Sequence, residues 1–277
     1  MTDPLADASP EAVVRALEAH AREEAVASAA IRGTHVENRK DMLLVLSGRP
    51  VAWTNGVHFA RFDVSEADRR IHEVTDVFRQ ANVPALWRVD ESNEPADLPK
   101  RLEAHGWRYH DDLPFLAAPI EAIPPLTDVP ERLLIERVHD RGTQTAWEHA
   151  MEHGFGMASD EAQAVFAMAE KAGFDPTGPW VRFVGTLDDQ PVASSGLMIR
   201  AGLAAIYNVA TIPEARRRGI GMAMTNAALD HARGLGYHVA VLGTSPAGRG
   251  IYERMGFREV QVVREYLWEP PEPGPVS

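Results

Sequence analysis

A segment rich in β-forming residues ends at Ile212 and leads, after a short turn, into Arg216-Arg217-Arg218-Gly219-Ile220-Gly221-Met222. Glycines that open a helix leave the N–H groups of its first turn uncovered, and those groups have no partner inside the helix. They lie at the positive end of the helix dipole, where an anion is stabilised. Together with three arginines, the pattern predicts a pyrophosphate-binding site.

The alternative is that the arginines form a solvated charged run and that the glycines only relax a turn. Helix starts favour acidic residues, so three cations at this position lower stability unless an anion is bound there. A strand, an arginine run and a glycine-opened helix in succession therefore favour the anion site.

The elements that must position this motif form a regular series. Apolar spacing in the second half predicts strands at residues 133–138, 180–187, 192–200, 203–212, 239–243 and 257–268, and helices at 143–152, 159–172, 219–235 and 247–255. Asp188-Asp189-Gln190-Pro191 reads as a hairpin turn. Strands mixed with helices predict an α/β sandwich.

The first half follows a similar plan. It predicts a helix that begins at Pro10 after the capping residue Ser9, strands at 41–46, 57–62, 84–89 and 113–120, and helices at 66–80 and 95–105. In both halves a helix ends at a glycine that an aromatic residue follows, Gly106-Trp107 and Gly256-Phe257. This joint is common in proteins, but the preceding elements also correspond, so we expect two similar domains.

The length of 277 residues fits about two domains. Three prolines between Ile123 and Pro130 give the best break. We therefore expect domains at residues 1–125 and 126–269, followed by a flexible, proline-rich tail at 270–277.

Composition excludes several classes of protein. The formal charge is 28 − 40 = −12, which argues against nucleic-acid binding. The chain has no cysteine, so it has no disulfide, thiolate zinc site or cysteine nucleophile. The acidic start does not resemble a secretory signal, and no apolar run is long enough to span a membrane. We expect a cytoplasmic protein.

The motif Arg216-x-x-Gly219-x-Gly221 resembles the coenzyme A motif of the GCN5-related N-acetyltransferases, or GNAT proteins. The later segment SPAGRGIYERMGF is similar to the closing strand–helix–strand of that family, and the resemblance covers residues 133–268. The first half resembles a degenerate copy, as in tandem GNAT proteins. It has the acidic Asp63-Val64-Ser65 where the glycine loop would stand, so we do not expect it to bind a pyrophosphate.

The resemblance implies roles for individual residues. It places the backbone of Val209, Ala210 and Thr211 where the family's fourth strand splays from the fifth and meets the pantetheine arm. It places Arg217, Arg218, Gly219, Ile220, Gly221 and Met222 on the pyrophosphate loop, with Arg216 at the leading position. Ser245 stands where many members carry a cofactor-binding asparagine.

Tyr252 matches the tyrosine that is proposed to protonate the leaving thiolate. A phenol with a reference pKa of about 10 can donate to a thiolate whose acid has a pKa of about 8.5. The alternative is that Tyr252 fills the core beside Phe257. The positions where many members carry a basic carboxylate are Tyr207 and Ala240, so the base stays open between a water relay and an amine that arrives neutral.

The resemblance thus implies an acetyl-CoA-dependent acyltransferase, an N-acetyltransferase that acts directly on a primary amine of a small molecule or peptide. No metal is expected, because His149 and His153 lie one helical turn apart without a third ligand nearby. Two alternatives stay open, an enzyme with another acyl-CoA or acceptor and a non-catalytic acyl-CoA-binding module. The sequence does not identify the acceptor, and a homodimer stays open.

Overall fold

The computed structural model describes residues 3–126 and 129–271. Its contacts divide the chain into two compact units, the first with residues 1–23 and 114–261 and the second with residues 24–113 and 262–277. Helix α1 (Pro10–Ser28) and strands β5 (Arg108–Pro119) and β11 (Arg258–Trp268) each contribute residues to both units. The units are therefore interleaved along the chain, unlike the single boundary expected at residues 125/126.

The first unit contains a mixed sheet with the strand order β5-β10-β9-β8-β7-β6. Its remaining strands are β6 (Leu133–Arg137), β7 (Trp180–Leu187), β8 (Gln190–Arg200), β9 (Leu203–Thr211) and β10 (Val239–Gly243). Neighbouring strands are antiparallel except β9 and β10, which are parallel. The coenzyme A motif predicted from the sequence follows β9, at the parallel pair.

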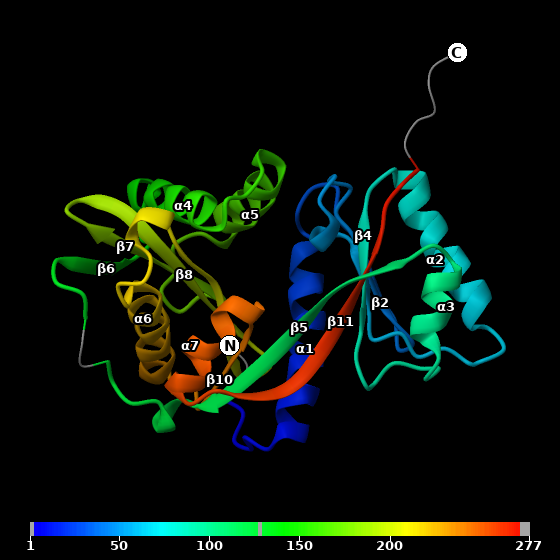
Figure 1. Ribbon diagram of the computed structural model, residues 1–277, viewed down its shortest axis with the longest axis horizontal. Coiled ribbons are helices and arrows are strands. Elements are labelled where there is room, and N and C mark those ends of the chain that lie inside the picture. The colour runs from blue at the N-terminus through cyan, green and yellow to red at the C-terminus, as the bar shows by residue number, and fades with distance from the viewer. Residues whose placement is uncertain (1–2, 127–128, 272–277) are drawn as a thin grey trace, which may run out of the picture. The chain divides into compact units, whose positions relative to one another are not determined.

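Helices cover both faces of this sheet (Figure 1). On one side lie α4 (Arg141–Phe155) and α5 (Ser159–Ala172), and on the other lie α6 (Ile220–Gly234) and α7 (Pro246–Met255). The Asp140 carboxylate caps α4 by accepting the N–H of Thr143 at 2.8 Å. Apolar side chains of α6 and α7 share one core with the sheet, including Leu197, Ile206, Met224, Leu229 and Phe257.

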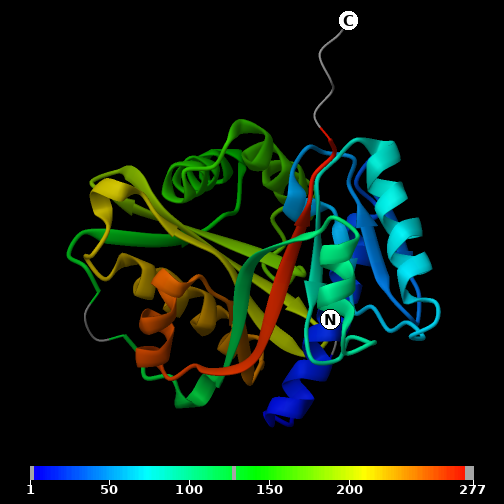
Figure 2. The same ribbon diagram turned by 45° about the vertical axis from the view of Figure 1, so that its right-hand side comes forward.

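In the second unit the strand order is β1-β2-β3-β4-β11, with β1 (His35–Asn38), β2 (Leu43–Leu46), β3 (Gly56–His58) and β4 (Ala85–Val89). Helices α2 (Ala67–Ala81) and α3 (Leu98–Ala104) cover one face (Figure 2). The core of this unit includes several aromatic rings, and those of Trp87 and Trp107 lie edge to face at 5.2 Å. The Trp107 indole N–H donates to the Thr75 hydroxyl at 3.0 Å, so this buried polar group is satisfied.

The predicted α/β class is confirmed, and the helices and strands of the second half lie close to their predicted bounds. Asp188 and Asp189 both have positive φ, as a two-residue hairpin turn requires. Strand β1 was not predicted, because a four-residue strand with exposed ends carries little apolar signal. Strand β3 ends at His58 and not at Phe62, since Phe59 turns to φ 55.

Residues 127–128 of the proline-rich break and 272–277 of the expected tail lie outside the described residues. Within the described part, no helix combines the length and the apolar character needed to cross a membrane.

Candidate functional site

The loop between β9 and α6 makes a tight left-handed turn. A short 3₁₀ helix at Pro213–Ala215 follows the strand, and Arg217 and Gly219 then adopt φ values of 59° and 80°. Gly219 is the N-cap residue of α6, and at this φ a side chain would be strained. The turn therefore requires a glycine at position 219.

The first turn of α6 presents backbone donors that the protein leaves unused. Within the described chain, no backbone N–H from Arg217 to Met222 has a hydrogen-bond partner, and the first helical bond runs from Ala223 N–H to Gly219 O at 3.1 Å. No acidic residue stands in this turn and no side chain caps it. A Cβ added at Gly221 would meet only the Thr211 hydroxyl, at 3.9 Å, so protein packing does not require this glycine. Such a donor set fits an anion of pyrophosphate type.

The three arginines of the motif differ in their contacts. The Arg216 guanidinium donates to protein carbonyls, from Nε to Thr211 O at 3.1 Å and from Nη2 to Gly154 O at 2.8 Å. Arg217 and Arg218 are exposed and make no hydrogen bond or ion pair with any described residue. Arg216 thus holds the loop against α4, while the other two side chains stay available to a ligand.

Strand β9 separates from β10 just before the loop. The parallel pairing joins Ala204 to Ala240 and Ala205 to Val241, and no later residue of β9 pairs with β10. On the other side, the register with β8 shifts at a bulge where Asn208 has φ 53. The backbone of Val209–Thr211 therefore has no strand paired with it on the β10 side. The assignment of this stretch to the pantetheine arm stays a prediction.

Tyr252 lies on α7 with its ring packed against the core and 6.0 Å from the ring of Phe257, at 73°. Burial raises the pKa of its phenol, with the neighbouring Thr225 hydroxyl acting in the opposite direction. The Thr225 hydroxyl donates to Gly221 O at 2.9 Å, which links the surroundings of Tyr252 to the first turn of α6. A phenol that stays protonated at neutral pH can act as a proton donor.

Ser245 is the N-cap residue of α7, and its side chain makes no capping bond. Its carbonyl accepts the N–H groups of Gly248 and Arg249, both at 3.1 Å. The residue is exposed, so its hydroxyl is accessible at the start of the helix.

The helix pair α4–α5 carries His149, His153 and several carboxylates. The His149 and His153 rings lie 4.1 Å apart, but no group of three or more possible metal ligands occurs in the part of the chain that the structure describes. Glu148 accepts a hydrogen bond from the Gln144 amide at 2.8 Å. Trp147 is fully buried and belongs to the core, whereas Phe155 is exposed at the end of α4.

Sequence reasoning missed Arg182, which is buried on β7. Its guanidinium donates to Ala169 O at 2.9 Å and Gly173 O at 2.6 Å, where α5 ends, and lies over the Trp180 ring at 5.2 Å. Burial lowers its pKa to about 10. A cation at the carboxyl end of a helix stabilises it, so Arg182 anchors α5. The available signal was a lone arginine in an apolar strand.

In the second unit, the residues that follow β3 correspond to those that follow the paired part of β9, and backbone hydrogen bonds occupy the edge there. The Glu94 N–H donates to Ala60 O at 2.9 Å and the Phe62 N–H donates to Glu94 O at 3.0 Å, so backbone bonds fill the space beyond β3. Ahead of α2, the Asp63 carboxylate accepts the backbone N–H of Ser65 at 2.8 Å and its hydroxyl at 2.6 Å. These hydrogen bonds lower the pKa of Asp63. An acidic group thus already stands where the first unit has unused donors.

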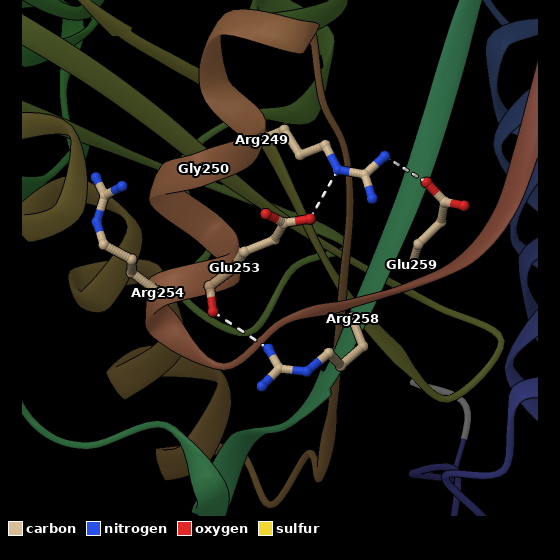
Figure 3. A pocket seen from close by; sticks show the side chains of 6 residues that line it. All are labelled: Arg249, Gly250, Glu253, Arg254, Arg258 and Glu259. Carbon is tan, nitrogen blue, oxygen red and sulfur yellow. Dashed lines mark hydrogen bonds and ion pairs between the residues drawn. The ribbon is translucent and has the colours of Figure 1, made fainter.

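A surface hollow lies on the outer side of α7 (Figure 3) and does not include the residues of the glycine loop. Arg249 pairs with Glu253 at 2.7 Å and with Glu259 at 2.6 Å, and Arg258 donates to the Glu253 carbonyl at 3.2 Å. Three arginines line the hollow, since Arg254 is also among its lining residues, and the two glutamates offset two of the three positive charges.

Comparison with known proteins agrees with this geometry. Residues 143–257 match the acetyltransferase (GNAT) family. A GCN5-related N-acetyltransferase from Kribbella flavida is 18% identical with a TM-score of 0.63, over 91% of this chain and 96% of that one. One from Sphaerobacter thermophilus is 18% identical with a TM-score of 0.65, over 95% and 94%. A search of curated proteins gave no significant match.

A tandem GNAT protein from the clavulanic acid biosynthesis pathway matches over 98% of this chain and 99% of its own, at 14% identity and a TM-score of 0.61. The chain therefore has the fold of a tandem GNAT protein. Its residues 143–257 form a domain of the acetyltransferase (GNAT) family, and the resemblance predicted from the sequence is confirmed.

Proposed function

We propose that the first unit binds acetyl-CoA and transfers its acetyl group to a primary amine of a small molecule or peptide. The observation that carries the proposal is the first turn of α6, whose N–H groups from Arg217 to Met222 have no partner among the described residues. This donor set follows the part of β9, after Ala205, that no longer pairs with β10. The matched GNAT family is one of acetyltransferases.

The residues of this chain would hold acetyl-CoA in three places. The N–H groups at the start of α6, with Arg217 and Arg218, would bind the pyrophosphate. The free backbone edge of Val209–Thr211 would bind the pantetheine arm. The exposed Ser245 hydroxyl would contact the arm from the start of α7. Acetyl-CoA supplies the acetyl group and a thiol leaving group.

In the proposed reaction, the amine nitrogen attacks the thioester carbonyl carbon and the carbon–sulfur bond breaks. A backbone N–H of the edge at Val209–Thr211 polarises the carbonyl. Tyr252 gives its proton to the sulfur and regains one from water, which also receives the proton that the amine loses. The second unit, with its closed strand edge and acidic Asp63, binds no CoA, so the expected stoichiometry is one per chain.

The test has two parts. Calorimetry measures the affinity for acetyl-CoA, and the release of free thiol measures the turnover of acetyl-CoA with a panel of primary amines. Gly221→Asp places a carboxylate against the pyrophosphate and should weaken binding at least about tenfold, or about 1.4 kcal/mol. The matched control is Gly234→Asp, which adds the same group at the exposed far end of α6 and should leave affinity unchanged. Equal affinity of a folded Gly221→Asp variant would contradict the site.

Turnover separates this function from its alternatives. Acetyl-CoA binding without turnover of any amine supports a non-catalytic acyl-CoA-binding module. A mass spectrum of the product separates acetyl transfer from the transfer of another acyl group.

A further inference from the structure

Arg182 carries a buried positive charge that no carboxylate of the described chain neutralises by an ion pair. Its side chain lies on β7 and is 2% exposed. Its Nη atoms donate to two backbone carbonyls, Ala169 O and Gly173 O, while its Nε has no hydrogen-bond partner among the described residues. Because buried charges in proteins are normally paired, this guanidinium is suited to bind an anion.

The surroundings of Arg182 are aromatic and only weakly acidic. The Trp147 and Trp180 rings lie 5.9 and 5.2 Å from its guanidinium carbon. Burial lowers the pKa of Arg182, and the charge of Glu148 on α4 acts in the opposite direction. The Glu148 carboxylate, however, accepts its hydrogen bond from the Gln144 amide, at 2.8 Å. The charge of Arg182 is therefore left without a carboxylate in contact.

A second unused donor lies beside this arginine. The Trp180 indole N–H is buried and has no hydrogen-bond partner in the part of the chain that the structure describes. A Cβ added at Gly196 would lie 2.8 Å from the indole nitrogen, so a side chain there would displace the indole. The same Cβ would lie 3.6 Å from Asn208 Oδ1, where β9 bulges. The unused N–H group therefore lies next to the bulge of β9.

Both donors lie close to the backbone edge that we assign to the thioester. Arg182 pairs with Gly196 across β7 and β8, and Gly196 pairs with Tyr207 across β8 and β9. Two strand spacings amount to about 10 Å. The edge at Val209–Thr211 begins two residues after Tyr207. A ligand with a chain of a few carbon atoms can therefore join the two places.

We propose that the amine acceptor carries a carboxylate, and that this carboxylate binds to the unused N–H groups of Arg182 and Trp180. The inference rests on the proposed acetyl transfer and names the class of its acceptor, an amino acid with a short apolar chain between its amine and its carboxylate. The carboxylate supplies the anion that Arg182 lacks, in charge-assisted hydrogen bonds. With the carboxylate held there, the amine lies at the edge of β9 that holds the thioester.

The test uses the full chain, acetyl-CoA and the amino acids β-alanine, γ-aminobutyrate and δ-aminovalerate, each compared with the alkylamine of the same chain length. Thiol release gives kcat/KM for every substrate. The wild type should acetylate at least one of the amino acids with a kcat/KM about 100-fold above that of its alkylamine, because the alkylamine leaves buried donors unpaired.

Two variants test the residues. Arg182→Gln keeps a donor for the carbonyls of α5 but removes the charge. It should lower kcat/KM for the amino acid about 10- to 100-fold and leave that for the alkylamine near wild type. Trp180→Phe keeps an aromatic ring without the N–H and should lower the ratio of the two values about tenfold. The matched control is Arg137→Gln, because Arg137 also donates to a carbonyl that follows α5, Phe174 O at 2.8 Å, and it should leave the ratio unchanged.

The ratio of the two kcat/KM values separates recognition from structure. A wild type that acetylates the amino acids no faster than the alkylamines overturns the inference while acetyl transfer itself stands. An unchanged ratio in Arg182→Gln and Trp180→Phe also overturns it, and so does an equal loss for both substrates, because the two residues would then be structural. If Arg182→Gln does not fold, the ratio in Trp180→Phe decides. A wild type that acetylates no amine overturns the proposed function and this inference with it.

Discussion

Nη2 of Arg216 donates to the carbonyl oxygen of Gly154 at 2.8 Å, across 62 positions of sequence. Helix α4 lies close to β9 at Gly154, since a Cβ there would lie 2.7 Å from that of Ala210. The first arginine of the coenzyme A motif thus fastens the end of α4 to the strand and loop of the candidate site. This contact separates the arginines into one that supports the loop and two that face outward.

The first prediction compares Arg216→Ala with Arg217→Ala. Arg216→Ala removes a charged donor from two carbonyls and should lower the free energy of unfolding by about 1 kcal/mol. Arg217→Ala removes an exposed side chain without a described partner, so it should leave the free energy of unfolding unchanged. It should weaken acetyl-CoA binding, and this weakening should be smaller at high salt, where the arginine charge is screened. Urea denaturation and calorimetry at two salt concentrations measure both quantities. A wild-type free energy of unfolding in Arg216→Ala would show that the two hydrogen bonds contribute nothing.

The second prediction concerns the close approach at Gly154. Gly154→Ala forces the added Cβ against Ala210 and the Thr211 backbone, which should cost about 1–3 kcal/mol of stability. Ala210→Gly in the same chain removes the clashing carbon and should restore part of the loss, as a double-mutant cycle would show. The control Gly142→Ala, on the same helix, meets only the Asp140 carboxylate at 3.5 Å and should be neutral or stabilising. Simple additivity of Gly154→Ala and Ala210→Gly would mean that these two positions do not press on each other.

The third prediction is that residues 126–277 do not fold alone. Strand β5 pairs with β10 through residues 115–119, and Ile120 and Ile123 lie in the core of the first unit. A chain that starts at residue 126 loses these contacts and leaves β10 with an unpaired, apolar edge. Circular dichroism and proteolysis should show a poorly ordered fragment, and a fragment of residues 114–277 should be more ordered. Cooperative unfolding of the shorter fragment would contradict the role we give to β5.

The glycine loop could be predicted from the sequence because its chemistry is local. Gly219 and Gly221 stand beside the arginines they work with, and helix geometry alone makes the first-turn donors available. The interleaving of the two units could not be predicted in this way. It depends on the pairing of β5 with β10 and of β11 with β4, and each partner lies more than a hundred residues away in the chain.

The same limit explains the side chains that were missed. Nothing near Arg216 in the sequence indicates that it binds Gly154, and nothing near His20 indicates that it meets Tyr207. The apolar strand around Arg182 is a sign of burial, but nothing in the sequence indicates its partners, which are backbone carbonyls at the end of a helix and not carboxylates. Local patterns thus locate the loop, while its supports depend on tertiary contacts.

The fourth prediction concerns Tyr252→Phe. The change keeps the ring that packs beside Phe257, so stability and acetyl-CoA affinity should stay near wild type. If Tyr252 is the general acid, kcat should fall about 10²- to 10⁴-fold, because the proton is delivered only as the thiolate leaves. Steady-state kinetics with the best amine, calorimetry and thermal unfolding give the three values. Wild-type kcat would remove Tyr252 from the mechanism and leave it as a core residue.

The fifth prediction is a pH dependence of stability that comes from His20. The folded-state pKa of about 4 lies below the ordinary value of 6.5, so the unfolded chain takes up this proton first as the pH falls. The neutral imidazole therefore contributes its full stability above about pH 6.5, and that contribution is lost progressively toward about pH 4, by about 3 kcal/mol in all. In His20→Gln this part of the loss should disappear. Urea denaturation at about pH 7 and about pH 4.5 measures the difference, and His110→Gln, at an exposed position, should keep the wild-type dependence. An unchanged pH dependence in His20→Gln would show that burial does not lower the pKa of His20 in the folded chain.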